Sequence, residues 1–508
     1  MERCCTLFVI FLSVCALTIA PDLLHQLVLR ASATSVLGRD TLPKLTVSLL
    51  GDFNYDILYG RPGGYGPCNQ GQASLVTPGC ESPLKLVQSV MDDVAKWEGT
   101  FTLFSGGLMR HSMETVTPAE MEYTMKEVIG VIASASGVNG TQDAASQPTV
   151  LALGGNDLSP ANSFSPISAQ PQYVQLLRLM LSEGLLTREE HSHMSYCGFY
   201  YRDVAGTKIR VIVLNTLLWS NSLRPPLSVG DVDPCGQFPF LQASIEWAKQ
   251  RDRSVIILGN EPPILNVEEA VRMKSVGDAT YYWRNDFREA YLRIIGSNRF
   301  TVAAQFFHTG TLGFVASSKL GPPMYIIPSV SPVAGSNPSY IRATLDSNTG
   351  RVVSLQQRYL VENGSWVYGD KLEDILHVSL RGMNEYSVED YLTIAQSEAH
   401  WEPFSRMRAG GRYLTEKEHC GFWCRHLIIC ASVYYEKTDI DYCTTSVLPS
   451  RSLGVWLSII SACSGGLALV AALTYGFGSR RIIFSPPPGA EREVTQRLFS
   501  TRAQKVYN

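Results

Sequence analysis

The chain has 508 residues, 45% of them hydrophobic, and a formal net charge of −3 at neutral pH. This length is enough for one large domain or for two to three ordinary ones. The nearly balanced charge, without a basic stripe that could follow a phosphate backbone, excludes a nucleic acid as the expected partner.

An apolar segment lies near the N-terminus. It runs from Leu7 to Ala20 behind a basic residue. The segment is too short to cross a bilayer comfortably, but it has the length and flank of a signal-peptide core. A small-x-small site at Ala31-Ser-Ala33 predicts a signal peptide over residues 1–33. Cleavage after Ala20 and an uncleaved anchor are the alternatives.

Short apolar runs recur after this segment, and each ends in a polar or glycine-rich loop. Continuous apolar runs of this length are typical of strands that are buried on both faces. The predicted strands are Leu45–Leu50, Thr100–Phe104, Thr149–Leu153, Ile209–Leu214, Val255–Leu258, Thr301–Phe307 and Met324–Ile327. Amphipathic stretches between them predict helices at about 84–97, 117–134, 171–185, 238–251 and 279–296. This alternation predicts an α/β layered domain over residues 34–384, with any chemistry in the loops at strand ends.

The pattern changes towards the C-terminus. Two more strand-like segments lie within Tyr340–Leu360, and residues 385–445 resemble a small helical lobe packed on the main domain. A second apolar segment, from Leu453 to Phe477, has 25 residues without a charge. At about 1.5 Å per residue it can cross a hydrocarbon core ~30 Å thick, so we expect a transmembrane helix over 453–477. A buried core helix is the alternative.

The charges that flank this segment predict its orientation. The basic pair Arg480-Arg481 places the tail, residues 478–508, in the cytoplasm, although Arg451 reduces the asymmetry. We therefore expect a single-pass type I membrane protein of the secretory pathway. Its large domain would lie in the lumen or outside the cell, at the cell surface or in an endosome or lysosome.

The cysteines agree with this topology. Of the twelve, Cys4, Cys5 and Cys15 fall in the predicted signal peptide and Cys463 in the predicted span. An even set of eight remains in an oxidising compartment, which predicts disulfides. The eight are Cys68, Cys80, Cys197, Cys235, Cys420, Cys424, Cys430 and Cys443. The last four lack the paired CxxC spacing of a zinc site, so disulfides are favoured there as well.

Two sequons predict N-glycosylation. They begin at Asn139 and Asn363, and each has the form Asn-Gly-Thr or Asn-Gly-Ser. Both lie in the part of the chain that is expected on the luminal side.

Five motifs follow predicted strands in order along the chain. They are Gly51-Asp-Phe-Asn-Tyr-Asp56, Phe104-Ser-Gly-Gly-Leu-Met-Arg-His111, Leu153-Gly-Gly-Asn-Asp-Leu-Ser-Pro-Ala-Asn-Ser-Phe164, Leu258-Gly-Asn-Glu-Pro-Pro263 and Ala303-Ala-Gln-Phe-Phe-His-Thr-Gly-Thr311. The succession resembles the calcineurin-like metallophosphoesterases, specifically the acid sphingomyelinase-like branch. The corresponding motifs of that branch have the form D-x-H, G-D, G-N-H-D/E-S-x-P-x-N-x-F, G-H-x-P-P and Q-F-F-G-H-T-H.

The residues that frame these motifs match well. They are Pro160, Asn162 and Phe164 in the third motif, Pro262 and Pro263 in the fourth, and Gln305-Phe-Phe in the fifth. The likeness spans roughly residues 45–445. It implies a layered metallophosphoesterase fold, in which helices flank a central β-sandwich and a disulfide-stapled helical lobe follows.

The resemblance also implies two metal ions, generally zinc, about 3.5–4 Å apart, which bind phosphate oxygens and activate a bridging water. Zinc requires histidine nitrogens or carboxylate oxygens. Asp52 is kept, but in an alignment without gaps the other metal positions hold Asn54, Gly107, Gly155, Asn260, Thr309 and Thr311, and the phosphate position holds Asn156. A shift by one residue restores Asn156 as the ligand asparagine and His308 as one ligand histidine, but not the bridging carboxylate.

Two cations that shared a glycine in place of the bridging carboxylate would repel each other with little compensation. We therefore expect no binuclear centre and no metal cofactor, with zinc as the alternative. His111 matches a histidine that this branch places near the leaving group as a candidate general acid. Without metals, we expect a vestigial or structural role for it.

The leading hypothesis is thus a catalytically inactive homologue at a membrane. Its cleft or surface would bind an unknown ligand, such as a lipid headgroup, a phosphorylated molecule or a protein, and act as a receptor. One alternative is an active phosphodiesterase that cleaves a sphingomyelin-type phospholipid or a nucleotide. Another is an adhesion or scaffold protein.

Overall fold

The computed structural model describes residues 44–69, 74–97, 101–137, 149–165, 170–228, 230, 232–317, 321–415, 418 and 420–446. Those up to Thr445 belong to one compact unit. The predicted signal peptide, the predicted span, the tail and Asn139 lie outside these ranges. Within the ranges, no helix combines the length and the apolarity that crossing a bilayer requires.

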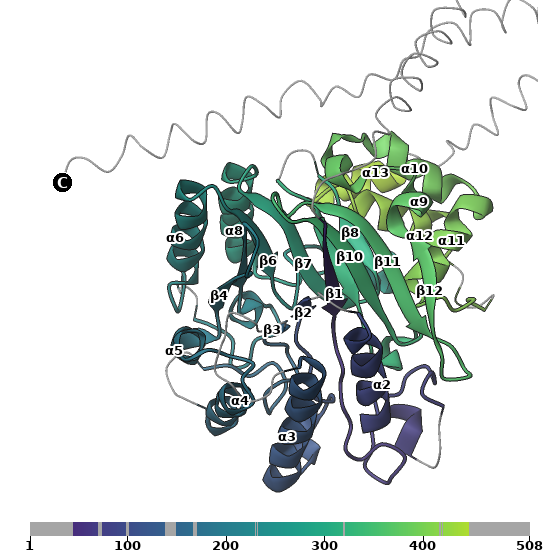
Figure 1. Ribbon diagram of the computed structural model, residues 1–508. Helices are drawn as coiled ribbons and strands as arrows, with labels where there is room; N and C mark the ends of the chain where they lie inside the picture. The colour runs from purple at the N-terminus through teal and green to yellow at the C-terminus, as the bar shows by residue number, and fades with distance from the viewer. Residues whose placement is uncertain are drawn as a thin grey trace, which may run out of the picture. The chain divides into compact units, whose positions relative to one another are not determined.

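Two six-stranded sheets form the core (Figure 1). The first has the order β12-β11-β10-β1-β2-β3 and the second β4-β5-β6-β7-β9-β8. The strands of the first sheet are β1 (Lys44–Leu50), β2 (Phe101–Phe104), β3 (Thr149–Leu151), β10 (Ser339–Asp346), β11 (Val352–Leu360) and β12 (Trp366–Lys371). Those of the second are β4 (Tyr200–Asp203), β5 (Ile209–Val213), β6 (Ser254–Leu258), β7 (Val302–Gly310), β8 (Gly313–Val315) and β9 (Met324–Pro328).

The centre of each sheet is parallel. Strands β1, β2 and β3 run parallel to one another, as do β5, β6, β7 and β9. Every residue of β2, β5 and β9 is buried, as the continuous apolar runs predict. The sheets approach each other where a bridge pairs Gly51, after β1, with Ser329, after β9. The carboxyl ends of the parallel strands, with the predicted motifs, therefore meet in one region.

Seven helices of the described residues precede β7. They are α2 (Leu84–Ala95), α3 (Pro118–Ala135), α4 (Pro171–Ser182), α5 (Arg188–Cys197), α6 (Gln237–Gln250), α7 (Val267–Met273) and α8 (Asn285–Ser297). The helix predicted at 279 begins only at Asn285, because Tyr281 and Trp283 first pair in short β-bridges. Short 3₁₀ helices lie at Gly66–Asn69, Met113–Thr115, Thr216–Trp219, Pro332–Ala334 and Leu380–Glu385.

The C-terminal lobe consists of helices that follow the first sheet. They are α9 (Leu372–Leu376), α10 (Val388–Gln396), α11 (Glu398–Arg408), α12 (Phe422–Ala431) and α13 (Lys437–Ser446). Helix α12 contacts α10 and α7, and α11 contacts α9 and β12. A salt bridge of 2.9 Å joins the buried Arg288 of α8 to Glu436. The predicted helical lobe is thus present, and it packs directly on the second sheet's helices.

All eight predicted disulfide cysteines are paired. The bonds are Cys68–Cys80, Cys197–Cys235, Cys420–Cys424 and Cys430–Cys443. The first two lie within the main domain and the other two within the C-terminal lobe, so each part has its own disulfides. Asn363, the described sequon, is exposed in the turn between β11 and β12.

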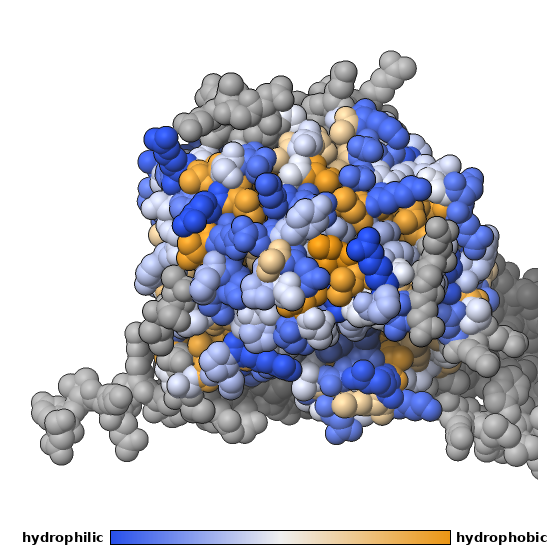
Figure 2. All heavy atoms as spheres, turned by 90° about the horizontal axis from the view of Figure 1, so that it is seen from below, coloured by the Kyte–Doolittle hydropathy of each residue, from blue (hydrophilic) through white to orange (hydrophobic). Residues whose placement is uncertain are grey.

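Seen from below, the molecule presents several hydrophobic patches that hydrophilic side chains separate (Figure 2). The visible described residues therefore form a mixed surface on that side. A ligand is more readily sought at the strand ends, where the predicted motifs converge.

Candidate functional site

The loop after β1 has an unusual backbone conformation. Asp52 and Asn54 both have positive φ, 42° and 45°. Their amides donate to the carbonyls of Gly106 and Gly107, at 3.0 and 2.9 Å. Aspartate and asparagine tolerate this left-handed region best among non-glycine residues. The backbone bonds hold both side chains at the end of the sheet.

The Asp52 carboxylate is paired with His308. The His308 Nε2 atom lies 2.9 Å from Asp52 Oδ2, and its Nδ1 atom lies 2.9 Å from the Ile327 carbonyl. Because a carbonyl only accepts, Nδ1 carries a proton, and Nε2 needs a second one to donate to the carboxylate. Burial lowers the pKa of His308, but Asp52 outweighs that effect, so the pKa is raised. The two residues therefore form an ion pair.

Three asparagines surround this pair. The Asn54 side chain donates to Asp52 Oδ2 at 3.4 Å, and the Asn156 side chain donates to Asn54 Oδ1 at 3.5 Å. Asn260 donates to the Ser105 carbonyl at 2.7 Å, and its own carbonyl accepts the His308 amide at 2.8 Å. The structure thus brings together the predicted positions 52, 54, 156 and 260.

Gly107 leaves no room for a side chain. It has a φ of 80°, and a Cβ atom there would lie 1.9 Å from Asp52 Oδ1. The neighbouring amides of Gly107 and Leu108 donate to the buried Asp157, at 3.3 and 2.5 Å, as does Gly154, at 2.7 Å. Burial raises the pKa of Asp157 to about 7 despite these bonds. Asp157 was not predicted, although it directly follows Asn156 in the third motif.

Gly155 is similarly enclosed. A Cβ atom at this position would lie 2.2 Å from Asn162 Oδ1. The Asn162 amide also donates to the Gly155 carbonyl at 2.6 Å. This glycine therefore supplies no side-chain ligand, and Asn162 orders its loop.

The gap-free assignment of Thr309 and Thr311 to metal positions does not match the geometry. Successive side chains of a strand point to opposite faces, so Thr309 points away from the side on which His308 meets Asp52. The register between β7 and β9 shifts between His308 and Gly310. Thr309 and Thr311 instead line a cavity with Arg408, whose Nη2 donates to Thr311 Oγ1 at 3.1 Å. His308, which the alignment shifted by one residue takes as a ligand histidine, is the side chain of this segment that lies beside Asp52.

His111 is held by a carboxylate that the sequence did not single out. Its Nδ1 atom lies 2.5 Å from Glu81 Oε1, and the Ser331 hydroxyl donates to Glu81 Oε2 at 3.3 Å. Glu81 is fully buried, whereas 38% of the His111 side chain is exposed. The Tyr65 ring stacks on the imidazole, with ring centroids 5.3 Å apart. Among the described residues, none forms a hydrogen bond with Nε2 of this partly exposed histidine.

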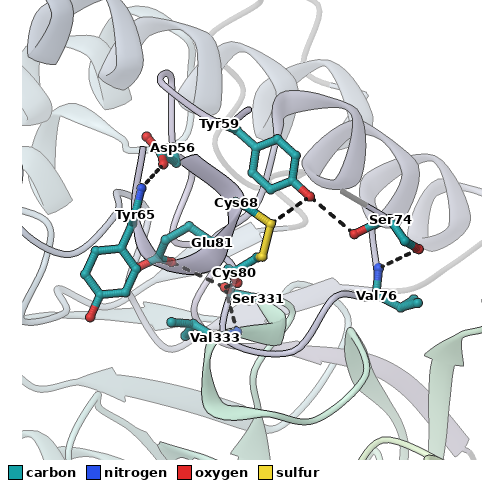
Figure 3. Close-up of a disulfide and its surroundings, with 10 residues drawn as sticks. All are labelled: Asp56, Tyr59, Tyr65, Cys68, Ser74, Val76, Cys80, Glu81, Ser331 and Val333. Carbon is teal, nitrogen blue, oxygen red and sulfur yellow. Dashed lines mark hydrogen bonds between the residues drawn. A yellow bond between two sulfur atoms is a disulfide. The ribbon is translucent and has the colours of Figure 1, made fainter. Parts of the chain in front are cut away.

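The Cys68–Cys80 disulfide supports this arrangement (Figure 3). Glu81 directly follows Cys80, and Tyr65 lies shortly before Cys68, just outside the loop that the bond closes. The Tyr65 amide donates to Asp56 at 2.9 Å. The disulfide therefore joins the segment that carries Glu81 to the segment that follows Tyr65.

Burial and charge act in opposite directions on this pair. Burial raises the pKa of Glu81, and hydrogen bonds from His111 lower it in part. Burial lowers the pKa of His111, but Glu81 outweighs that effect, so the pKa of His111 is raised. The imidazole therefore stays protonated to a higher pH than that of a free histidine.

Glu261 is a further carboxyl group that the sequence reasoning missed. It follows Asn260, and its buried Oε2 atom has no hydrogen-bond partner among the described residues. Burial raises its pKa to about 7, and Asp52 contributes to that shift. Glu261 is the one charged residue of the fourth motif, and this charge is the only sequence signal that marks it.

Two zinc ions do not fit these residues. Zinc takes several histidine, cysteine or carboxylate ligands. Around the Asp52 carboxylate the site offers one imidazole and neutral amides, and burial raises the pKa of the neighbouring Asp157 and Glu261 carboxyl groups to about 7. The Asp52 carboxylate already binds His308. Nowhere in the described part of the chain do three or more His, Cys, Asp or Glu side chains form a group that could hold a metal.

Comparisons with known proteins point to one family, although no family model matches the chain. An acid sphingomyelinase-like phosphodiesterase 3b from Mus musculus is 28% identical over 273 residues, 49% of this chain and 56% of that protein. A sphingomyelinase phosphodiesterase D from Dictyostelium discoideum is 23% identical over 292 residues, 54% of this chain and 60% of that protein. The chain thus spans less than two thirds of the length of these curated relatives.

Among solved structures, a dimetal phosphatase from Danio rerio is 12% identical. The match covers 64% of this chain and 98% of that one, with a TM-score of 0.38. A score this low supports no conclusion, so the sequence relatives carry the assignment.

Proposed function

We propose that this chain, which belongs to the acid sphingomyelinase-like branch of the calcineurin-like metallophosphoesterases, binds a ligand at its strand ends without hydrolysing it by two-metal chemistry. One observation carries the proposal: the Asp52 carboxylate is bonded to His308, and the Gly107 backbone lies against it where a bridging carboxylate belongs. The site therefore lacks the charge that two cations need.

The setting that we propose for this function is a membrane of the secretory pathway. Four disulfides indicate folding in an oxidising compartment. The uncharged segment 453–477 would anchor the domain near lipid and carry a signal to the tail, as in a receptor.

Metal content tests the proposal. We expect the glycosylated full chain, purified without chelator, to contain far less than one zinc per molecule by elemental analysis. Adding chelator should leave its Tm unchanged, because there would be no bound metal to remove, whereas loss of a metal that stabilises the native state would lower Tm. Two zinc per chain, with a chelator-induced fall in Tm of several degrees, would contradict it.

An active phosphodiesterase is the second candidate, and the His111–Glu81 pair favours it. A histidine whose pKa is raised and whose Nε2 is accessible has the properties of a general acid for a leaving group. Turnover of bis-p-nitrophenyl phosphate, lost in both His111→Gln and Asp52→Ala, would support this candidate. Wild-type turnover no higher than that of His111→Gln would favour the first candidate, ligand binding without two-metal hydrolysis.

A further inference from the structure

A groove lies between α7, the end of β7 and helices α11 and α12 of the C-terminal lobe. Two cavities of about 40 and 280 Å³ compose it. Both are lined by Val267, Glu268, Thr311, Arg408 and Ile428. The groove is therefore separate from the Asp52–His308 pair, although it begins one residue beyond it on β7.

Arg408 places a positive charge in the groove. Its guanidinium donates to the Leu312 carbonyl at 3.2 Å and to Thr311 Oγ1 at 3.1 Å, both neutral acceptors. It forms no salt bridge with a carboxylate of the described residues. A guanidinium has five N–H donors, so several remain for a ligand. Burial lowers the pKa of Arg408, and nearby Glu268 opposes that effect.

Glu268 places a negative charge in the same groove. It lies in the first turn of α7 and is exposed at the rim. Within the described ranges its carboxylate accepts no hydrogen bond and joins no salt bridge. Burial raises its pKa, while Arg408 and His308 lower it. Two opposite charges thus face one cavity without contacting each other.

The remaining walls are largely apolar. They include Leu265, Phe314 and Tyr282 in the smaller cavity, and Val271 and Trp401 in the larger one. A simple anion that bonded to Arg408 would approach the Glu268 carboxylate, and a simple cation at Glu268 would approach Arg408. Either ligand would cover the opposite charge of the groove without pairing it, which is costly.

We propose that this groove binds a small zwitterion, with an oxyanion on Arg408 and Thr311 and an ammonium group on Glu268. Such a ligand satisfies both charges with charge-assisted hydrogen bonds. The apolar walls would accept a hydrocarbon part attached to it. The proposal names the ligand class for the binding function proposed above and rests on that function.

Isothermal titration calorimetry on the full chain, purified in detergent, tests the proposal. The zwitterionic probes are O-phosphoethanolamine and β-alanine, and the single-charge probes are methyl phosphate and ethylamine. We expect saturable binding of at least one zwitterion, about tenfold or more tighter than either single-charge probe. Equal binding of methyl phosphate, or no binding of either zwitterion, would overturn the proposal.

Variants connect the binding to the groove. Glu268→Gln should weaken zwitterion binding about tenfold and leave methyl phosphate binding unchanged, and Arg408→Lys should weaken both. The matched control is Arg272→Gln, which removes a charge from the same helix outside the groove. If Arg408→Lys fails to fold, the rim variant Glu268→Gln still decides, since zwitterion binding that it leaves unchanged contradicts the proposal.

A final arm identifies the source of the zwitterion. Dihexanoyl phosphatidylethanolamine carries the same ammonium and phosphate on a lipid. If it competes more strongly than O-phosphoethanolamine, the groove takes a lipid headgroup, and if it competes more weakly, the groove takes a free molecule. Zinc content and phosphodiester turnover are unaffected by these results, so a failure here is distinguishable from a failure of the proposed function.

Discussion

Two histidines of this site each face a carboxylate, but under opposite conditions. His308 is almost fully buried. One of its ring nitrogens is bonded to Asp52 and the other to a backbone carbonyl. His111 binds the buried Glu81 through one nitrogen, while 38% of its side chain is exposed. The first pair is closed within the protein, and the second is open to a ligand.

The difference shows how the same residue types serve different purposes. In a closed pair, both charges are satisfied internally, so the pair contributes to folding and to the shape of the site. In an open pair, the carboxylate fixes the orientation and proton affinity of the imidazole, which can then act on something else. Substitutions at the closed pair should therefore change stability, and those at the open pair should chiefly change the titration of the imidazole.

The largest effect should follow removal of His308. His308→Ala leaves Asp52 without its cation and opens a cavity, so we expect a loss of roughly 2–4 kcal/mol in the free energy of unfolding. Urea unfolding followed by fluorescence measures it. The control is His191→Ala on α5, outside the site. A loss in His308→Ala below about 1 kcal/mol would show that the pair is not closed.

The pH dependence of the closed pair is the next effect. Because the folded pKa of His308 is raised, its stabilisation is fully present below about pH 6.5, the usual value of an unfolded histidine, and is lost as pH rises through the folded pKa. Asp52→Asn should therefore cost about 1–2 kcal/mol at pH 5.5 and less at pH 8.5. Urea unfolding at both values checks this. A cost that grows with pH would contradict an ion pair.

The open pair should respond chiefly in its titration. Glu81→Gln removes the charge that raises the pKa of His111, so the midpoint of the His111 ring titration should fall, with a stability loss of about 1 kcal/mol. NMR of ring-labelled histidine measures the midpoint. Ser331→Ala, which removes only the hydroxyl that bonds Glu81, is the control and should shift it less. An unchanged midpoint in Glu81→Gln would mean that the carboxylate does not govern this imidazole.

The strands that could be predicted from the sequence are those buried on both faces. Val302–Gly310 and Met324–Pro328 are nearly continuous apolar segments, so their pattern was clear. Trp366–Lys371 was missed because it is a mostly exposed edge strand without a long apolar run. Helix Arg188–Cys197 was missed because its sequence is polar, although Thr187 and Glu190 form a capping box that signals its start.

The site was predictable only as far as the motifs reach. Asp52 and the asparagines of the motifs lie close together in the fold, but a gap-free alignment cannot show that the register between β7 and β9 shifts between His308 and Gly310. Glu81 lies outside every motif and approaches His111 through the fold. Arg408 comes from the C-terminal lobe, far along the chain from Thr311. Such long-range contacts depend on the packing of the lobe, which periodicity does not determine.

The smallest effect should follow removal of His111 itself. Because the ring is partly exposed and the amide of a glutamine can still donate to Glu81, His111→Gln should cost less than about 1 kcal/mol in unfolding free energy, well below the loss in His308→Ala. Tyr65→Leu, which removes the stacked ring, is the matched control. A cost of more than about 2 kcal/mol would make His111 a structural residue like His308 and would leave the fold without an open pair. A small cost, together with a raised titration midpoint, would mean that the protein maintains a buried carboxylate and a stacked tyrosine around an imidazole that folding does not require, which is the pattern of a group kept for contact with a ligand.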